Sequence, residues 1–81
     1  MSGAQPVRDV ARFSFELPEA GRVSIEVFDL AGRRSSTALD ASMSAGPHEI
    51  AWSAGNLSPG VYHARLEFGQ RTEAIRLIRV R

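Results

Sequence analysis

The sequence predicts an all-β fold, a small antiparallel β-sandwich of six or seven strands. Apolar residues recur at every second position in several short runs, as is typical of half-buried strands. Turn residues separate these runs at intervals of about 8–12 residues, which is the spacing of sandwiches and barrels. We expect residues 1–10 to form an extended lead-in and residues 11–81 to form one domain.

Composition narrows the classes of function. The chain has 81 residues, enough for a single domain, with ten basic residues, nine acidic residues and no cysteine. The net charge of +1 gives no general attraction to nucleic acids or membranes, and disulfides and cysteine-based metal sites are excluded. No apolar run approaches the ~18–20 residues of a membrane-spanning helix, so we expect no membrane insertion. No signal peptide is visible at the start.

Two runs near the N-terminus form the clearest strands, within residues 11–18 and 21–30. Their alternating apolar residues are Phe13, Phe15, Leu17, Val23, Ile25 and Val27. Gly21 lies in the turn between them, where we expect a positive φ. After the second run, Asp29 should bond backbone amides of a hairpin turn, and Gly32 should close that turn in the left-handed conformation.

The middle of the chain is less regular. Residues 33–39 predict a weak strand, and residues 40–46 predict a loop in which Met43 is the only sizeable apolar anchor. Alternation of apolar and polar residues then resumes in residues 47–53 and 61–68, which predicts two further strands.

The C-terminal part contains two more turns and one ambiguous segment. Pro59 and Gly60 fit the second and third positions of a type II turn, directly before Tyr62. Gly69 marks a tight reversal. The apolar spacing in residues 72–81 fits either a short helix or a strand. We favour the strand because the segment is rich in β-branched residues and shorter than the ~12 residues that an unsupported helix needs.

Reactive side chains show no catalytic or metal-binding pattern. His48 and His63 each lie on an alternating run, and no third ligand is spaced for zinc. No nucleophile-elbow or phosphate-binding glycine motif is present. We therefore expect no enzymatic activity, no cofactor, no metal and no small-molecule substrate.

Two aromatic residues admit two interpretations. Trp52 and Tyr62 could form a sugar-stacking platform, but both fall in the apolar register of their strands, which favours the core. If Trp52 is a core residue, Trp52→Ala should cost ~3–5 kcal/mol and unfold the domain. Phe28 lies out of register with its strand, and it either caps one end of the barrel or forms an exposed contact.

The last segment carries the best candidates for recognition, Arg76, Arg79 and Arg81. The alternative is that these arginines protect an edge strand, because charge on an edge prevents unwanted strand pairing.

An ordered set of motifs resembles a known family. The residues that carry the resemblance are Leu17, Pro18, Gly21, Val23, Val27, Phe28, Asp29, Gly32, Arg33, Gly46, His48, Trp52, Gly60 and Tyr62, followed by a closing apolar strand that ends in Arg81. Together they are similar to the C-terminal sorting domain of type IX (Por) secretion cargo, and equally to the Ig-like domain of flagellar hook-capping proteins. Ser35 stands where the family often has a β-branched apolar residue, so we expect the third strand to pack poorly.

The resemblance implies an Ig-like sandwich with one of two functions. The first is a sorting and surface-attachment domain at the end of a larger exported bacterial protein, which passes through the periplasm and docks to outer-membrane secretion machinery. The segment that includes Pro59, Gly60 and Tyr62 would then be read by that machinery. The second is a structural Ig-like module of a hook cap or cell-surface stalk, which contacts a neighbouring structural protein. Neither function involves nucleic acid.

Overall fold

The structure, a computed structural model, describes residues 4–80 of the chain. In this range the protein consists of strands, turns and loops, without a helix. The seven strands are β1 (Ala4–Val7), β2 (Val10–Leu17), β3 (Gly21–Asp29), β4 (Arg34–Met43), β5 (Gly46–Ser53), β6 (Gly60–Phe68) and β7 (Arg71–Arg79). Within residues 4–80 there is consequently no helix long and apolar enough to cross a membrane.

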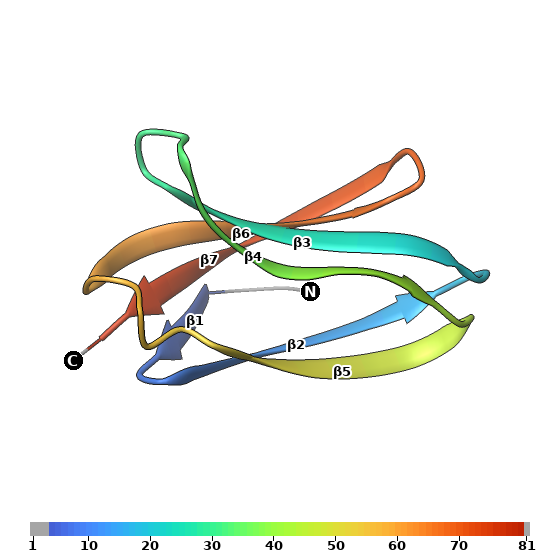
Figure 1. Ribbon diagram of the computed structural model, residues 1–81, viewed down its shortest axis with the longest axis horizontal. Coiled ribbons are helices and arrows are strands. Elements are labelled where there is room, and N and C mark those ends of the chain that lie inside the picture. The colour runs from blue at the N-terminus through green and yellow to red at the C-terminus, as the bar shows by residue number, and fades with distance from the viewer. Residues whose placement is uncertain (1–3, 81) are drawn as a thin grey trace.

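The strands form two sheets that face each other (Figure 1). One sheet has the order β1-β7-β6-β3-β4, and the other pairs β2 with β5. Two hairpins, β3–β4 and β6–β7, stay within the larger sheet, whereas the connections before β2, β3, β5 and β6 cross between sheets. This is the order of the C, F and G strands of an Ig sandwich, extended by a C′ strand and opposed by the B–E pair. The predicted small β-sandwich is confirmed, with seven strands and with one parallel pairing, β1 to β7.

The core consists of the inward side chains of both sheets. Every second residue of β2 is buried, as is every second residue along the middle of β3 and β6. Phe13, Ile25 and Leu77 are the largest of the side chains that are almost entirely enclosed. Because burial of apolar surface is the main favourable term in folding, this alternation fixes which face of each sheet turns inward.

The N-terminal segment is part of the sandwich. Residues 4–7, expected within a lead-in, form β1 and pair in parallel with β7. The side chain of Val7 is only 3% exposed, and the Val80 amide donates a hydrogen bond to the Val7 carbonyl oxygen at 2.8 Å. The sheets therefore begin before residue 11, where the domain was expected to start.

Strand β4 is longer than predicted, and the loop expected over residues 40–46 is wrong. Residues 40–43 continue the strand by pairing with the start of β3, which leaves only Ser44 and Ala45 between β4 and β5. Two register shifts interrupt the pairing of β3 with β4. No side chain of β4 is fully buried, in line with the poor packing expected from Ser35. Bulges of this kind on an edge strand discourage pairing with other chains.

The ambiguous C-terminal segment is a strand, as favoured above. Strand β7 pairs with β6 without a register shift, and Gly69 and Gln70 form a two-residue hairpin loop. Gly69 has a φ of +58° at the first central position, which suits a type II′ turn.

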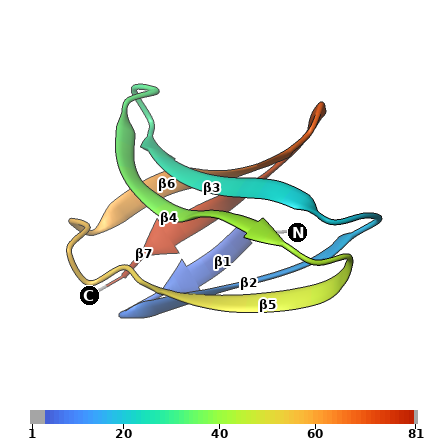
Figure 2. The ribbon, with the colours of Figure 1, turned by 45° about the vertical axis from the view of Figure 1, so that its right-hand side comes forward.

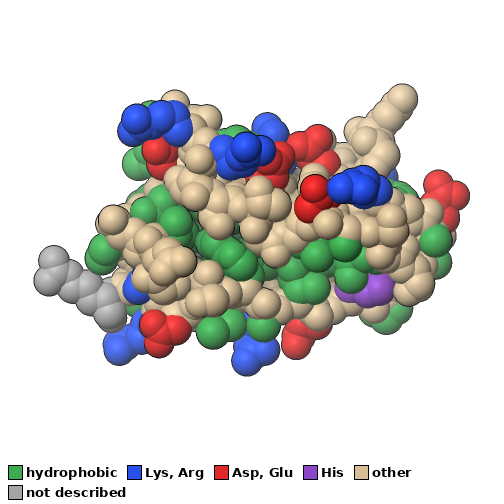
Figure 3. All heavy atoms as spheres, viewed as in Figure 1, with side chains coloured by type: hydrophobic (Ala, Val, Ile, Leu, Met, Phe, Trp, Pro, Cys, Tyr) green, Lys and Arg blue, Asp and Glu red, His purple; other side chains and the backbone are tan. Residues whose placement is uncertain are grey.

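The two-stranded sheet is narrow and leaves one side of the sandwich partly open (Figure 2). Between the unpaired edges of β4 and β5, an apolar band is visible at the surface (Figure 3). Partly buried side chains from these strands include Leu39, Met43, Ile50 and Trp52. Trp52 packs against Phe13, with ring centroids 6.5 Å apart, but it is not enclosed. Trp52, for which the core was favoured, is partly buried and packs against the core, and the narrow sheet places it at this opening.

Candidate functional site

The turn between β3 and β4 has the predicted chemistry. Asp29 Oδ1 accepts hydrogen bonds from the backbone amides of Ala31 and Arg33, each at 2.9 Å, and Gly32 has a φ of +84°. The Arg33 amide is the largest cause of a lowered Asp29 pKa. The Ala31 amide and the Arg33 guanidinium also lower this pKa, against burial, which raises it. The ionised carboxylate thus ties the hairpin turn together.

Gly21 is structurally important for a reason other than the one expected. Its φ is not positive, because it already belongs to β3. A Cβ atom at this position would lie 2.7 Å from Cε1 of the Phe68 ring. The glycine therefore allows an aromatic ring to lie directly on the backbone.

The Pro59-Gly60 turn differs from the prediction in geometry. Gly60 has a φ of +156°, far from the approximately +80° that a type II turn requires, and it opens β6. The hydrogen-bonded turn comes earlier, where the Leu57 amide donates to the Ala54 carbonyl oxygen at 3.0 Å. Pro59 and Gly60 are both exposed.

Tyr62 anchors this connection to the core. Its side chain is 9% exposed, and its hydroxyl donates a hydrogen bond to the Ser58 carbonyl oxygen at 2.7 Å. A tyrosine near the start of a strand that bonds back to the chain upstream is the tyrosine corner of Ig-type sandwiches. Because the Tyr62 ring is buried in the core, it offers no exposed face that could stack on a sugar together with Trp52.

Arg76 and Arg79, two of the three candidate arginines, lie in different environments. Arg76 is exposed on the solvent-facing side of the five-stranded sheet, which we call the outer face. Arg79 is partly buried, and its Nε donates to the Ala54 carbonyl oxygen at 3.1 Å. Its guanidinium also contacts the Val80 carbonyl oxygen. Arg79 is therefore a packing residue that joins β7 to the β5–β6 connection, beside Gly60, its partner in the strand pairing. Arg81 lies outside the described residues.

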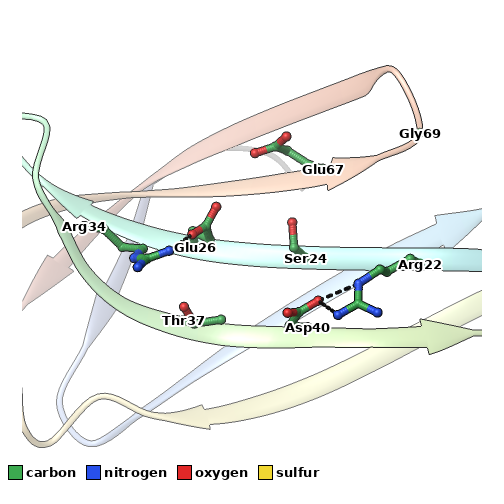
Figure 4. Close-up of a pocket in the computed structure, with 8 residues that line it drawn as sticks. All are labelled: Arg22, Ser24, Glu26, Arg34, Thr37, Asp40, Glu67 and Gly69. Atoms are coloured by element: carbon green, nitrogen blue, oxygen red, sulfur yellow. Dashed lines mark hydrogen bonds and ion pairs between the residues drawn. The ribbon is translucent and has the colours of Figure 1, made fainter.

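The β3–β4 and β6–β7 hairpins rise at opposite ends of the outer face (Figure 1). A polar groove of about 380 Å³ runs between β6 and β4, with Ser24 and Glu26 of β3 at its floor (Figure 4). Arg22 is paired with Asp40 at 2.8 Å, and Arg34 is paired with Glu26 at 2.9 Å. The charged groups of the groove mostly neutralise one another, and such exposed pairs contribute little to stability.

A second concavity lies on the same face beside the β3–β4 hairpin. We call it the hairpin hollow. Its volume is about 460 Å³, and it is lined by Phe28, Asp29, Leu30, Gly32, His63, Arg65 and Ala74. The Arg65 guanidinium lies 4.5 Å from the centre of the Phe28 ring, in a cation–π contact. Arg65 is also paired with Glu67 at 3.1 Å and with Glu26 at 3.8 Å. Phe28 was expected either to cap one end of the barrel or to form an exposed contact. It is a residue of the outer face that Arg65 partly covers.

The two histidines belong to different sheets. His48 Nε2 is 2.7 Å from the Ser44 carbonyl oxygen, and its ring packs 5.5 Å from Phe15. His63 belongs to the other sheet and is exposed. Among residues 4–80, no three metal-ligating side chains lie close enough together to hold an ion.

Sequence reasoning missed Leu30 and Arg65 as residues of the outer face. Leu30 lies in the turn itself, between Asp29 and Gly32, so its 69% exposure could be inferred only once the hairpin was placed. Arg65 is one of several polar residues that alternate with apolar ones along β6, and nothing in the sequence distinguishes it from the others. The signal that could have identified this region is the out-of-register Phe28.

Compared with protein-family models, with curated proteins and with solved structures, the chain has no significant match.

Proposed function

We propose that this domain is a protein-docking module, the C-terminal sorting and surface-attachment domain of a larger exported bacterial protein. It docks to outer-membrane secretion machinery through the part of the outer face that β6 and β7 form. The support is the motif set described above together with the sandwich, in which those motifs form the turns, the tyrosine corner and the closing strand.

The observation that carries the proposal is the state of Arg76. It projects from the closing strand onto the outer face, and within residues 4–80 it makes no ion pair. Arg79, by contrast, is already bonded to the chain. An exposed cation on the outer face that has no partner among residues 4–80 is available to a carboxylate of another protein, and it would contribute to orientation and rate of association.

Export of a reporter tests this function. A fluorescent protein with its own signal peptide is fused ahead of the domain in a bacterium that has the secretion system. The wild-type fusion should reach the cell surface, and the reporter without the domain should stay in the periplasm. Arg76→Ala should reduce surface delivery, whereas Arg8→Ala, which removes an exposed arginine at the other end of the chain, should not.

Two results would count against the proposal. Periplasmic retention of the wild-type fusion would contradict sorting altogether. Full delivery of the Arg76→Ala fusion would contradict docking through this side chain. Circular dichroism of each purified variant separates a loss of docking from a loss of folding.

The apolar band between β4 and β5 favours a second candidate, a structural Ig-like module of a hook cap or stalk. Permanent assemblies bury apolar surface, and Leu39, Met43 and Ile50 offer such surface at an open edge. The two functions predict different precursors. A secreted enzyme or adhesin ahead of the domain would favour sorting, and a hook-cap scaffold-binding region would favour the structural module.

A further inference from the structure

We propose that the hairpin hollow binds an acidic segment of a partner protein, with an apolar side chain of that segment in the hollow and a carboxylate on Arg76. The inference rests on the proposed docking function and names the chemistry of the partner. It depends on three features of the outer face: exposed apolar surface, an excess of positive charge and a strand register that places the two next to each other.

On the outer face, the most exposed apolar side chain is Leu30, at the tip of the β3–β4 hairpin. Leu30 is 69% exposed, and the only other large apolar side chain in the described residues with high exposure is Val10, at 48%. A single exposed leucine is ordinary on a protein surface. Leu30, however, borders a hollow of about 460 Å³ that is also lined by Phe28 and Ala74. An apolar side chain of a partner in this hollow would therefore have three apolar residues to contact.

The charged side chains around the hollow include one more arginine than they include carboxylate partners. Arg33 is paired with Asp29 at 3.3 Å, Arg34 with Glu26, and Arg65 with Glu67. Each carboxylate near the hollow thus already has a guanidinium. Arg76 has none in the described part of the chain, and an additional carboxylate would complete the pattern.

The strand register places Arg76 next to the hollow. Arg34, Phe28, His63 and Arg76 are directly opposite one another across β4, β3, β6 and β7. Side chains of directly paired residues share a face and lie within reach of one another. Ala74, which lines the hollow, lies two residues before Arg76 on the same face of β7. A segment lying across these strands would meet the hollow and the guanidinium together.

Charge complementarity therefore favours an acidic peptide segment over a basic one. The acidic side chains on the strands beside the hollow are Glu26 and Asp29 of β3, Glu67 of β6 and Glu73 of β7. Glu26, Asp29 and Glu67 already have arginine partners, and Glu73 also has an interaction partner.

Titration of the full chain by ¹H–¹⁵N NMR tests the proposal. The probe is a capped peptide of alternating Glu and Leu, and the comparison peptide has Gln in place of Glu. We expect saturable shifts for the acidic peptide at Phe28, Leu30 and Arg76, with a dissociation constant on the order of 1 mM or lower. The affinity should fall as salt is added, because exposed charges are screened.

Matched variants complete the experiment. Leu30→Ser and Arg76→Ala should each weaken binding by roughly five- to tenfold, in proportion to the loss of one apolar contact or one charge pair. Val10→Ser and Arg8→Ala remove similar side chains elsewhere, and they should leave the affinity unchanged.

Three outcomes would overturn the inference: no saturable shift, shifts that lie outside the hollow, or equal binding of the Glu and Gln peptides. This titration is independent of the export assay. Reporter export without peptide binding would refute the acidic partner and leave the sorting function, whereas peptide binding without export would do the reverse.

Discussion

A single hydroxyl links the β5–β6 connection to the core. The ring of Tyr62 is enclosed by the sandwich, while its oxygen reaches back to the Ser58 carbonyl. The exposed Pro59 and Gly60 lie between these two residues, so the hydrogen bond closes the connection that they form. Their place in the motif set is thus accounted for by the fold, independently of any partner.

Tyr62→Phe isolates the contribution of this hydroxyl. The variant keeps the ring in the core and removes only the hydrogen bond, so the free energy of unfolding should fall by about 1 kcal/mol. Urea denaturation followed by circular dichroism should show a lower midpoint with an unchanged slope. A midpoint equal to that of the wild type would mean that the corner does not stabilise the domain.

At the scale of elements, the β3–β4 hairpin combines a regular turn with an irregular edge. The Asp29 carboxylate fixes the turn through hydrogen bonds from the amides of Ala31 and Arg33 and an ion pair with the Arg33 guanidinium. Beyond the turn, two register shifts distort the pairing of β4 with β3. The result is a hairpin that holds Leu30 in place at its tip and presents a poor template for another strand.

The charge on Asp29 makes the hairpin sensitive to acid. Because its pKa in the folded state is below the ordinary value of 3.8, the folded state binds its proton more weakly than the unfolded state does. The stabilisation is fully present above that ordinary value and is lost as the pH falls through the folded-state pKa. Asp29→Asn keeps an acceptor oxygen but has no charge to titrate.

We therefore expect thermal melts of Asp29→Asn to vary less with pH below about pH 4 than melts of the wild type. Melting temperatures measured by circular dichroism from about pH 2.5 to pH 7 provide the comparison. If both proteins lost stability in parallel over this range, another carboxyl group would be responsible.

Across the whole molecule, the sequence predicted the parts in which alternation is strong. Strands β2, β3 and β6 carry large apolar residues such as Phe13 and Ile25 at every second position, and they form much of the core. The end of β4 was missed because its small residues, such as Ala41 and Ser42, show little contrast between faces. Strand β1 was missed because it is short and is defined by pairing with β7, which is remote in sequence.

The candidate site was predictable only in part, because its residues meet through strand register. Side chains at odd and even positions of a strand face opposite sides of the sheet, so on β7 Arg76 and Arg79 must lie on opposite faces. Because β7 carries apolar residues on both faces, its sequence does not show which face is buried. Strand pairing brings together Phe28, His63 and Arg76 from three strands. This pairing depends on the geometry of the hairpins, which cannot be read from the residue pattern of a single strand.

The position of the core can be tested by comparing two aromatic residues that are neighbours. Phe13 is 1% exposed between the sheets, whereas Trp52 lies at the open side between β4 and β5. Phe13→Ala should cost ~3–5 kcal/mol, which approaches the whole stability expected for a domain of this size. Trp52→Ala removes a side chain that is already partly hydrated, and it should cost about 1–2 kcal/mol.

Thermal melts of the two variants should consequently differ in kind. Phe13→Ala should show no cooperative transition, because too little stability remains to hold the sheets together. Trp52→Ala should still melt cooperatively, at a temperature lowered by about 4–8 °C for each kcal/mol lost. Circular dichroism is the suitable probe, because Trp52 is the only tryptophan of the chain. If Trp52→Ala abolished the transition while Phe13→Ala kept it, the centre of the core would lie at the β4–β5 opening, and that opening would not be available as a contact surface.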